Sequence, residues 1–359
     1  MGFSFMRSVS LVVALTALSL LLACPGGGPN PNPNPHPTPG TESCAVESSG
    51  LELPLPDEAG TLPDFGGQAV DLSCVGTPEA IGAGANVTLE GCVDIFGLGG
   101  KAKSGIKVAI FADSQDPKNE APQYGETDIA VKLDADGLDC ASGGADENDI
   151  ACLATGCDKE GYYRIDGVPT HVPLTMKVHK PGDSDVIETY TWGVVFDYLG
   201  TEATDGVAKY EANLVYKSTY DSIPTLAGRI VDGQQNTADG IGRGVVAGEV
   251  RDCQDRVVQG ATVTTDQYDP STKITYFDGN TDDPKPNLAR LSTNTDGLYV
   301  VLNATTDAAV STHTLSAGML DPACTGEDCA CVLLGTRVIH AYPDTVSIAT
   351  FRGDFPNAN

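Results

Sequence analysis

The sequence predicts an all-β protein built from two β-sandwiches in tandem. Three observations lead to this prediction. The chain has 41 Gly and 23 Pro among its 359 residues, and such residues favour turns between short strands over long helices. Short segments alternate between apolar and polar residues, which is the period of a half-buried strand. The arrangement of these segments occurs twice, in residues 86–217 (the first copy) and in residues 244–359 (the second copy).

The composition limits the classes of partner. The net charge is −28, with 41% hydrophobic residues. Negative charge of this size opposes binding to nucleic acid, so we expect no nucleic-acid partner. It is typical of a soluble, exposed protein. The length is sufficient for two domains of ordinary size.

Residues 1–23 have the features of a targeting segment. Arg7 supplies a positive charge, and the apolar run that ends at Ala23 is short for a membrane span. The run closes with Leu-Leu-Ala-Cys, which resembles the lipobox of bacterial lipoproteins. That resemblance implies that Cys24 becomes the mature first residue and carries acyl chains, which would anchor the protein to a membrane. The alternative is an ordinary secretory signal, with Cys24 as a disulfide partner.

The residues after Cys24 predict a spacer and an irregular segment. Pro25 follows Cys24 where an inner-membrane retention signal would have Asp, so we expect an outer-membrane lipoprotein that faces the periplasm or the cell surface. Residues 24–43 are rich in Pro and Asn and predict an extended tether. Residues 44–85, which we call the apron, have no clear period. We expect one disulfide within the apron, and packing of the apron on the first sandwich.

Each copy contains six or seven expected strands. Those of the first copy are 87–94, 105–111, 160–165, 173–180, 189–197 and 210–216. Those of the second copy are 245–252, 261–265, 274–277, 298–303, 313–317, 336–342 and 345–351. Residues 218–243 form the expected linker, with a short helix near residues 225–230. Trp192 and Phe196 are expected in the core.

The two copies align through short motifs. Gly91-Cys92-Val93 matches Gly248-Glu249-Val250, and Gly105 to Val108 matches Gly260 to Val263. Asp158 to Tyr163 matches Asn294 to Tyr299, after a long insertion in the first copy. Each glycine permits a turn or a close backbone approach, and each Val or Tyr after it points into the core.

These motifs resemble those of carboxypeptidase regulatory-like domains, which have a Greek-key sandwich of the transthyretin-like or prealbumin-like type. The residues that fit the family pattern are Gly248, Val250, Asp252, Gly260, Ala261, Val263, Gly297 and Tyr299. The resemblance covers roughly two thirds of the chain and rests mostly on turn and core positions. It implies a non-catalytic structural or binding module, with no active-site residues to transfer. The second copy departs from the pattern at residues 304–310, where the family has a Pro-rich turn.

The cysteines predict disulfides in an oxidising compartment. Without Cys24, ten of the 11 cysteines remain. They divide evenly among the apron and the two copies: Cys44, Cys74; Cys92, Cys140, Cys152, Cys157; Cys253, Cys324, Cys329, Cys331. The even division favours bridges within each group. The expected pairs are Cys44–Cys74, Cys92–Cys140, Cys152–Cys157, Cys253–Cys331 and Cys324–Cys329.

The insertion of the first copy contains a candidate metal site. Asp134, Asp136 and Asp139 surround a Gly turn, and hard cations such as calcium bind several oxygens on a tight loop. The spacing departs from that of an EF-hand, because no Glu closes the loop. We therefore expect no cofactor other than weakly bound calcium, and a solvated acidic loop is the alternative.

No constellation of an enzyme is recognised, so we expect a non-catalytic protein. Tyr162, Tyr163, His171 and His179 could suggest an iron site, but extended strand would separate the two histidines by roughly 26 Å. An alternative function is carbohydrate binding in a surface polysaccharide system. Tyr268, Tyr276 and Phe277 are the nearest cluster of aromatic residues for such a platform. The expected partners are a membrane, through the lipid, and an envelope protein or polysaccharide.

Overall fold

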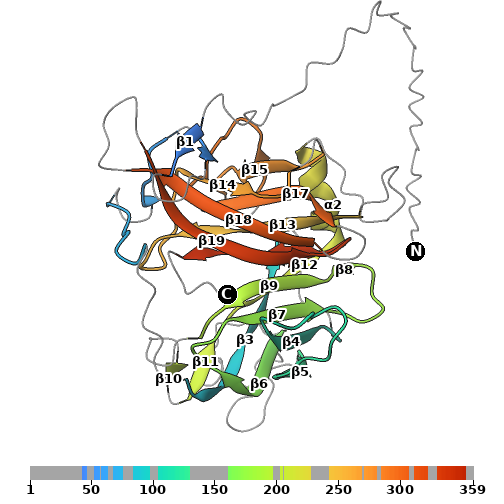
Figure 1. The fold of residues 1–359 in the computed structure, drawn as a ribbon. Helices are drawn as coiled ribbons and strands as arrows, with labels where there is room; N and C mark the ends of the chain where they lie inside the picture. Colours follow the sequence, from blue (N-terminus) through green and yellow to red (C-terminus); the bar gives the residue numbers. More distant parts are fainter. Residues whose placement is uncertain are drawn as a thin grey trace, which may run out of the picture. The chain divides into compact units, whose positions relative to one another are not determined.

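The structure, a computed structural model, describes fourteen stretches of the chain. These are residues 43–46, 52–56, 58–63, 68–75, 84–97, 104–129, 161–196, 203–204, 206–227, 242–268, 271–280, 284–306, 311–321 and 330–352. Within them the protein is mostly β, with one short helix, which confirms the all-β prediction (Figure 1). All of these stretches belong to one compact unit, which extends from His36 to Asn359.

The apron contributes two short strands, β1 (Ser43–Ala45) and β2 (Glu52–Pro54), which pair with each other. The first copy contains β3 (Asn86–Phe96), β4 (Lys107–Ala112), β5 (Gly125–Asp128), β6 (Tyr162–Pro169), β7 (Leu174–His179), β8 (Val186–Ile187), β9 (Thr189–Val194), β10 (Ala203–Thr204), β11 (Val207–Lys209) and β12 (Ala212–Tyr216). The helix is α2 (Lys217–Leu226).

The second copy contains β13 (Gly242–Arg251), β14 (Ala261–Thr265), β15 (Lys273–Phe277), β16 (Pro286–Asn287), β17 (Leu298–Thr306), β18 (Ser311–Leu320), β19 (Cys331–Ala341), β20 (Val346–Ile348) and β21 (Phe351–Arg352). Each expected strand corresponds to one or two of these elements. Helix α2 begins directly after β12 and ends at Leu226, so the helix expected near residues 225–230 was placed too late in the chain. Its side chains Thr219, Tyr220 and Pro224 are buried, and this packing was not apparent from the polar linker sequence.

The strands of the two copies pair in the same pattern. In the first copy, β3 pairs antiparallel with β6 on one side, and on the other side it pairs in parallel first with β11 and further along with β12. In the second copy, β13 pairs antiparallel with β17, and on its other side it pairs in parallel first with β20 and further along with β21. In the opposite sheets, the order β4-β7-β9 corresponds to β14-β18-β19. Backbone hydrogen bonds from Val93 to Gly161 and from Val250 to Gly297 are equivalent. These pairings agree with the alignment of the copies made from the sequence.

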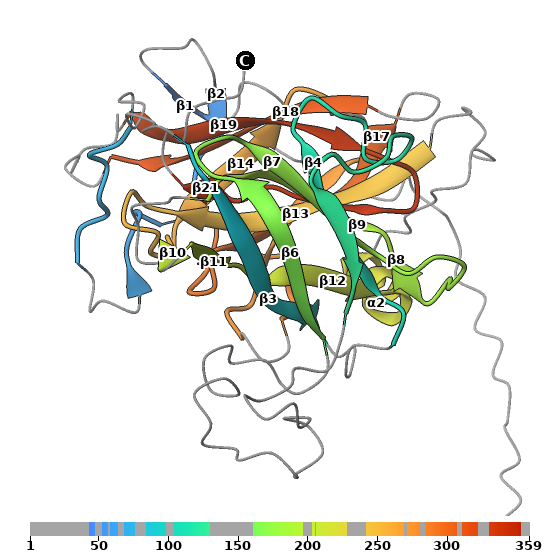
Figure 2. The ribbon, with the colours of Figure 1, turned by 90° about the horizontal axis from the view of Figure 1, so that it is seen from below.

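One sheet continues from one copy into the other. Strand β20 of the second copy pairs in parallel with β9 of the first copy, with Val346 opposite Thr189 and Ile348 opposite Thr191. The pairing creates a ten-stranded sheet. Nine of its strands follow the order β16-β15-β17-β13-β20-β9-β7-β4-β5, and the tenth, β21, pairs with β13 beside β20. Figure 2 shows the green strands β9 and β7 and the teal strand β4 of this sheet from below. A shared sheet fixes the orientation of the two copies through backbone hydrogen bonds.

The aromatic residues of β9 pack across this junction. Tyr190 and Trp192 belong to the apolar cluster of the second copy, and the Tyr190 ring lies 5.0 Å from that of Tyr342. Phe196 is buried in the cluster of the first copy. Trp192 and Phe196 are therefore core residues, as expected, although Trp192 fills the core of the other copy.

The described part of the apron up to residue 75 packs on the second copy, whereas Ala85 at the end of the apron bonds to Thr170 of the first copy, which corrects the expectation from the sequence. Leu62 and Val70 belong to the second copy's apolar cluster. Thr61 forms a β-bridge with Gln259, and Glu58 forms an ion pair with Arg290. In Figure 1 the blue strand β1 accordingly lies beside the orange strands of the second copy. Residues close in sequence to the first copy therefore complete the core of the second.

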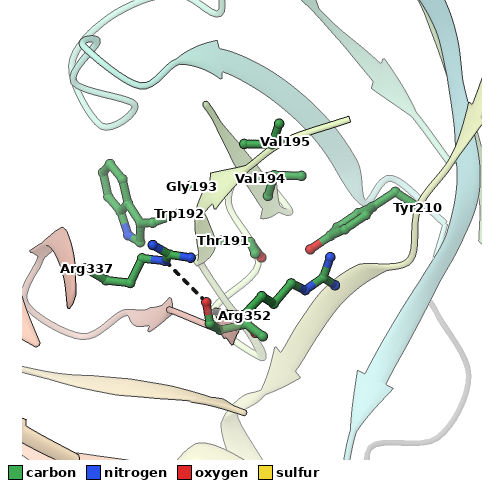
Figure 3. A pocket seen from close by; sticks show the side chains of 9 residues that line it. Thr191, Trp192, Gly193, Val194, Val195, Tyr210, Arg337 and Arg352 are labelled. Atoms are coloured by element: carbon green, nitrogen blue, oxygen red, sulfur yellow. Dashed lines mark hydrogen bonds between the residues drawn. The ribbon is translucent and has the colours of Figure 1, made fainter. Parts of the chain in front are cut away.

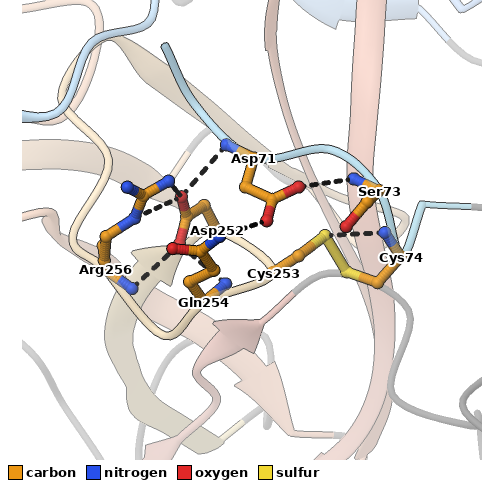
Figure 4. Close-up of a disulfide and its surroundings, with 7 residues drawn as sticks. All are labelled: Asp71, Ser73, Cys74, Asp252, Cys253, Gln254 and Arg256. Atoms are coloured by element: carbon orange, nitrogen blue, oxygen red, sulfur yellow. Dashed lines mark hydrogen bonds and ion pairs between the residues drawn. A yellow bond between two sulfur atoms is a disulfide. The ribbon is translucent and has the colours of Figure 1, made fainter. Parts of the chain in front are cut away.

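The disulfides of the apron follow this packing. Cys44 is bonded to Cys331, and Cys74 is bonded to Cys253 (Figure 4). The expected pairs Cys44–Cys74 and Cys253–Cys331 are wrong, because each apron cysteine faces a cysteine of the second copy. Their Cα atoms are 5.4 and 5.6 Å apart, within the usual range. Cys92 is also disulfide-bonded. Cys140, Cys152, Cys157, Cys324 and Cys329 lie outside the described residues.

Candidate functional site

A groove of about 440 Å³ lies where the two copies meet, and we call it the seam groove. It is lined by Asp94, Phe96, Lys209, Tyr210, Glu211, Asn213, Val215, Ala247, Gly248, Glu249, Arg251, Phe277, Pro284, Asp296, Leu298, Tyr299, Val346, Ile348, Thr350 and Arg352. Strands β3 and β12 supply one wall, and β13, β15, β17 and β20 supply the other. The groove therefore exists only because the shared sheet brings the copies together.

Apolar side chains line part of the seam groove. The rings of Phe96, from the first copy, and Phe277, from the second, meet edge to face at 5.9 Å. Both belong to the third apolar cluster of the protein, together with Val215, Leu298 and Ile348. A concave apolar surface with a few polar groups around it is the usual form of a small-molecule site.

Carboxylates give the groove an acidic side. Asp94 and Glu211 are exposed but partly desolvated, and this desolvation raises the pKa of both above the ordinary value. The negative charges of Asp94 and Glu249 raise the pKa of Glu211 further. These three side chains therefore interact electrostatically across the junction. Such a group favours a ligand that is cationic or donates hydrogen bonds.

Other carboxylates of the groove are held by neighbouring groups. Arg251 forms an ion pair of 2.6 Å with Glu249. Asp296 accepts hydrogen bonds from the backbone N–H groups of Gly279 and Leu298, at 3.1 and 3.0 Å. Burial nevertheless raises the pKa of Asp296 above its ordinary value. These contacts keep the walls of the groove in defined positions.

The Asp252 turn stabilises the second copy next to the apron and is not part of the groove. Asp252 accepts hydrogen bonds from the backbone N–H groups of Asp71, Gln254 and Arg256, and it pairs with the Arg256 guanidinium (Figure 4). Burial opposes its charge, but these hydrogen bonds lower the pKa of Asp252 below its ordinary value. The family-pattern residue Asp252 therefore has a structural role beside the Cys74–Cys253 disulfide.

The aromatic cluster expected to bind sugars is not an exposed platform. Tyr268 is 48% exposed, whereas Tyr276 and Phe277 are buried. Tyr276 and Phe277 point to opposite faces of β15 and enter different apolar clusters. The Tyr276 hydroxyl accepts a hydrogen bond from the Val263 N–H. Phe277 alone of the three lines the seam groove, a position that strand alternation could not reveal without the neighbouring copy.

The structure also places the residues of the iron hypothesis. The Tyr163 hydroxyl donates to the carbonyl of Tyr210, and the Tyr162 hydroxyl bonds to Glu90, which together with burial raises the Tyr162 pKa to about 12. His179 contacts Glu126 at 3.0 Å. Among the described residues, no group of three or more His, Cys, Asp or Glu side chains could hold a metal ion. Asp134, Asp136, Asp139 and Cys24 lie outside the described residues.

No family model matches the sequence, and no curated protein matches it at a significant level. In the described part of the chain, no helix is long and apolar enough to span a membrane.

Proposed function

We propose that this protein is a lipid-anchored component of the bacterial cell envelope with a non-catalytic binding role. The lipobox-like sequence at Cys24 supports the anchor, and the two apron disulfides fit an oxidising compartment outside the cytoplasm. The resemblance of both copies to carboxypeptidase regulatory-like domains, with their Greek-key, transthyretin-like sandwich, supports an accessory role. The anchor would be an outer-membrane one, with the tether as a spacer.

The seam groove is the observation that carries the binding role. Its volume of about 440 Å³ is within the range of small-ligand sites. A purely structural pair of sandwiches would gain stability by filling such a space, because packing at a junction otherwise resembles that of a core. A partner that fits the groove would combine an apolar face with groups that donate hydrogen bonds.

Carbohydrate binding is the second candidate, and the groove gives it a new location. Sugars stack on aromatic rings and donate hydroxyl hydrogens to carboxylates. Phe96 and Tyr210 supply aromatic surface in the groove, and Asp94 and Glu211 supply acceptors. The exposed Tyr268 is not among the residues that line this groove.

Two experiments test the proposed function. Mass spectrometry of the mature protein extracted from membranes should find acyl chains on Cys24, and Cys24→Ser should abolish this modification. A soluble mature protein without lipid would exclude the anchor.

A glycan array tests the alternative, with Asp94→Asn as the groove variant and Asp128→Asn as the control. Asp128 lies on β5 with an exposed side chain and does not line the groove. Glycan binding that Asp94→Asn weakens and Asp128→Asn leaves unchanged would favour a carbohydrate ligand. Absence of binding at millimolar concentration would exclude it.

A further inference from the structure

A second, smaller cavity lies beside the seam groove, and we call it the seam cavity (Figure 3). It is lined by Thr191, Trp192, Gly193, Val194, Val195, Tyr210, Arg337, Thr350 and Arg352. Tyr210, Thr350 and Arg352 also line the groove. The first copy supplies β9 and Tyr210, and the second copy supplies the two arginines. Its volume is about 30 Å³, and about 10–15 Å³ of such space holds one water molecule.

Two polar atoms of residues that line the seam cavity are buried without a hydrogen-bond partner. These atoms are Thr191 Oγ1 and Trp192 Nε1, and each side chain is at most 4% exposed. A buried polar group without a partner is costly and uncommon, and a bound water molecule or ion is one of the explanations for it. Both residues line the cavity, which has room for one small ion or one water molecule.

Three of the nine side chains that line the cavity can only donate hydrogen bonds. An indole N–H and a guanidinium can only donate, and the cavity has one indole and two guanidinium groups. No Asp or Glu is among the residues that line it. Arg337 is largely buried and donates from Nε to the carbonyl of Thr350 at 3.4 Å, while Arg352 pairs with Asp255 at 2.9 Å. Figure 3 shows both guanidinium groups beside Thr191.

We propose that the seam cavity binds a small monovalent anion of the size of chloride. An anion accepts hydrogen bonds from the indole and guanidinium groups of the lining, and the positive charge of the guanidinium groups favours an anion over a neutral water molecule. The net charge of −28 repels anions from the protein as a whole, so the local donors must hold the ion. Because both copies contribute donors, the ion reinforces the junction between them. This inference does not depend on the lipid anchor or on the ligand of the groove.

The first test measures the thermal stability of the whole protein in sodium chloride or sodium bromide and in sodium gluconate, at equal ionic strength. Gluconate is too large for the cavity. The native protein should show a saturable rise in Tm of about 2 °C or more that is specific to the halides. Thr191→Val and Trp192→Phe should lose this rise, because each removes a donor. Thr191→Val does so with little change in volume, whereas Trp192→Phe also shortens a buried side chain and lowers the basal stability.

Thr275→Val is the matched control. Thr275 Oγ1 is also buried without a partner, on β15 of the same sheet, but Thr275 does not line the cavity. Removing an unsatisfied hydroxyl should affect basal stability similarly at both positions, so only the halide-dependent rise distinguishes them. Retention of the full rise in Thr191→Val and Trp192→Phe would overturn the proposal, as would loss of the rise in Thr275→Val.

Diffraction from crystals soaked in bromide gives the direct test. An anomalous peak within hydrogen-bond distance of Trp192 Nε1 is expected. A cavity that holds only water, with no anomalous peak, would overturn the proposal.

Discussion

The hydroxyl group of Tyr299 donates a hydrogen bond of 2.6 Å to the carbonyl oxygen of Ala349, the residue that follows β20. Tyr163 makes the equivalent bond of 2.8 Å to Tyr210, which lies between β11 and β12. Each tyrosine also pairs in register with a glycine, Gly248 in one copy and Gly91 in the other. The tyrosine bond therefore satisfies the carbonyl at the point where the parallel pairing is interrupted in each copy.

Tyr299→Phe tests this bond. The Ala349 carbonyl loses the hydroxyl donor in a buried position, so we expect a loss of about 1–3 kcal/mol in the free energy of unfolding. Urea denaturation measures the loss, and Tyr163→Phe should behave similarly. Tyr268→Phe is the control because Tyr268 is exposed. Equal small effects of all three variants, below about 0.5 kcal/mol, would contradict a structural role for the bonds.

Gly248→Ala tests the close approach of the backbones. A β-carbon at Gly248 would overlap the carbonyl oxygen of Ala349, and one at Gly91 would overlap that of Tyr210. Because a backbone carbonyl in a sheet cannot move aside, each alanine should cost about 1–3 kcal/mol or more. Gly60→Ala is the matched control: its β-carbon would meet the end of the flexible Met319 side chain at 2.6 Å. Thermal unfolding should therefore rank Gly60→Ala as the mildest of the three, and the reverse order would refute the argument.

Non-reducing peptide mapping should recover the pairs Cys44–Cys331 and Cys74–Cys253. The second bridge closes a loop across a sequence separation of 179 residues, which includes the entire first copy. A long closed loop restricts the unfolded chain, so Cys74→Ser/Cys253→Ser should lower stability by about 2–5 kcal/mol. Denaturation in the absence of reductant measures the loss. Recovery of a Cys44–Cys74 peptide would show that the apron is closed on itself instead.

Glu211→Gln should stabilise the protein at neutral pH. Partial desolvation and the charges of Asp94 and Glu249 raise the pKa of Glu211 in the folded state. Because the folded-state pKa of Glu211 is raised, its contribution to the stability of the folded state is fully present below the unfolded pKa of about 4.3. This contribution is lost as pH rises through the folded-state pKa, where Glu211 becomes charged in the folded protein. The variant should therefore be more stable than the native protein at pH 7, with the difference vanishing below pH of about 4. A difference that persists at low pH would assign the effect to packing.

Asp252→Asn should have the opposite pH dependence. Hydrogen bonds and the Arg256 pair outweigh burial and lower the pKa of Asp252, so its contribution is present above its unfolded pKa of about 3.9 and is lost as pH falls through the folded value. We expect the variant to be less stable at pH 7 and to approach the native protein in acid. Urea denaturation across this pH range provides the measurement. A cost independent of pH would show that charge is not the source.

Local patterns predicted the strands well but not their neighbours. Alternation located β4 and β14, and the glycine motifs aligned Tyr163 with Tyr299, because these signals arise within a few residues. The seam groove could not be predicted in this way. Asp94 and Glu211 are far apart in sequence from Phe277, and none of the three belongs to a recognisable motif.

The all-β class, the repeat and the burial of Trp192 and Phe196 could be inferred from the chain itself, since residue period and turn chemistry are local properties. The disulfide partners of the apron, the burial of Tyr276 and Phe277, and the pairing of β20 with β9 required the tertiary structure. An even number of cysteines permits several pairings, and a strand edge can accept any strand of suitable register. Which partner is chosen depends on the apolar surface that each contact buries, and that surface is assembled from segments more than a hundred residues apart.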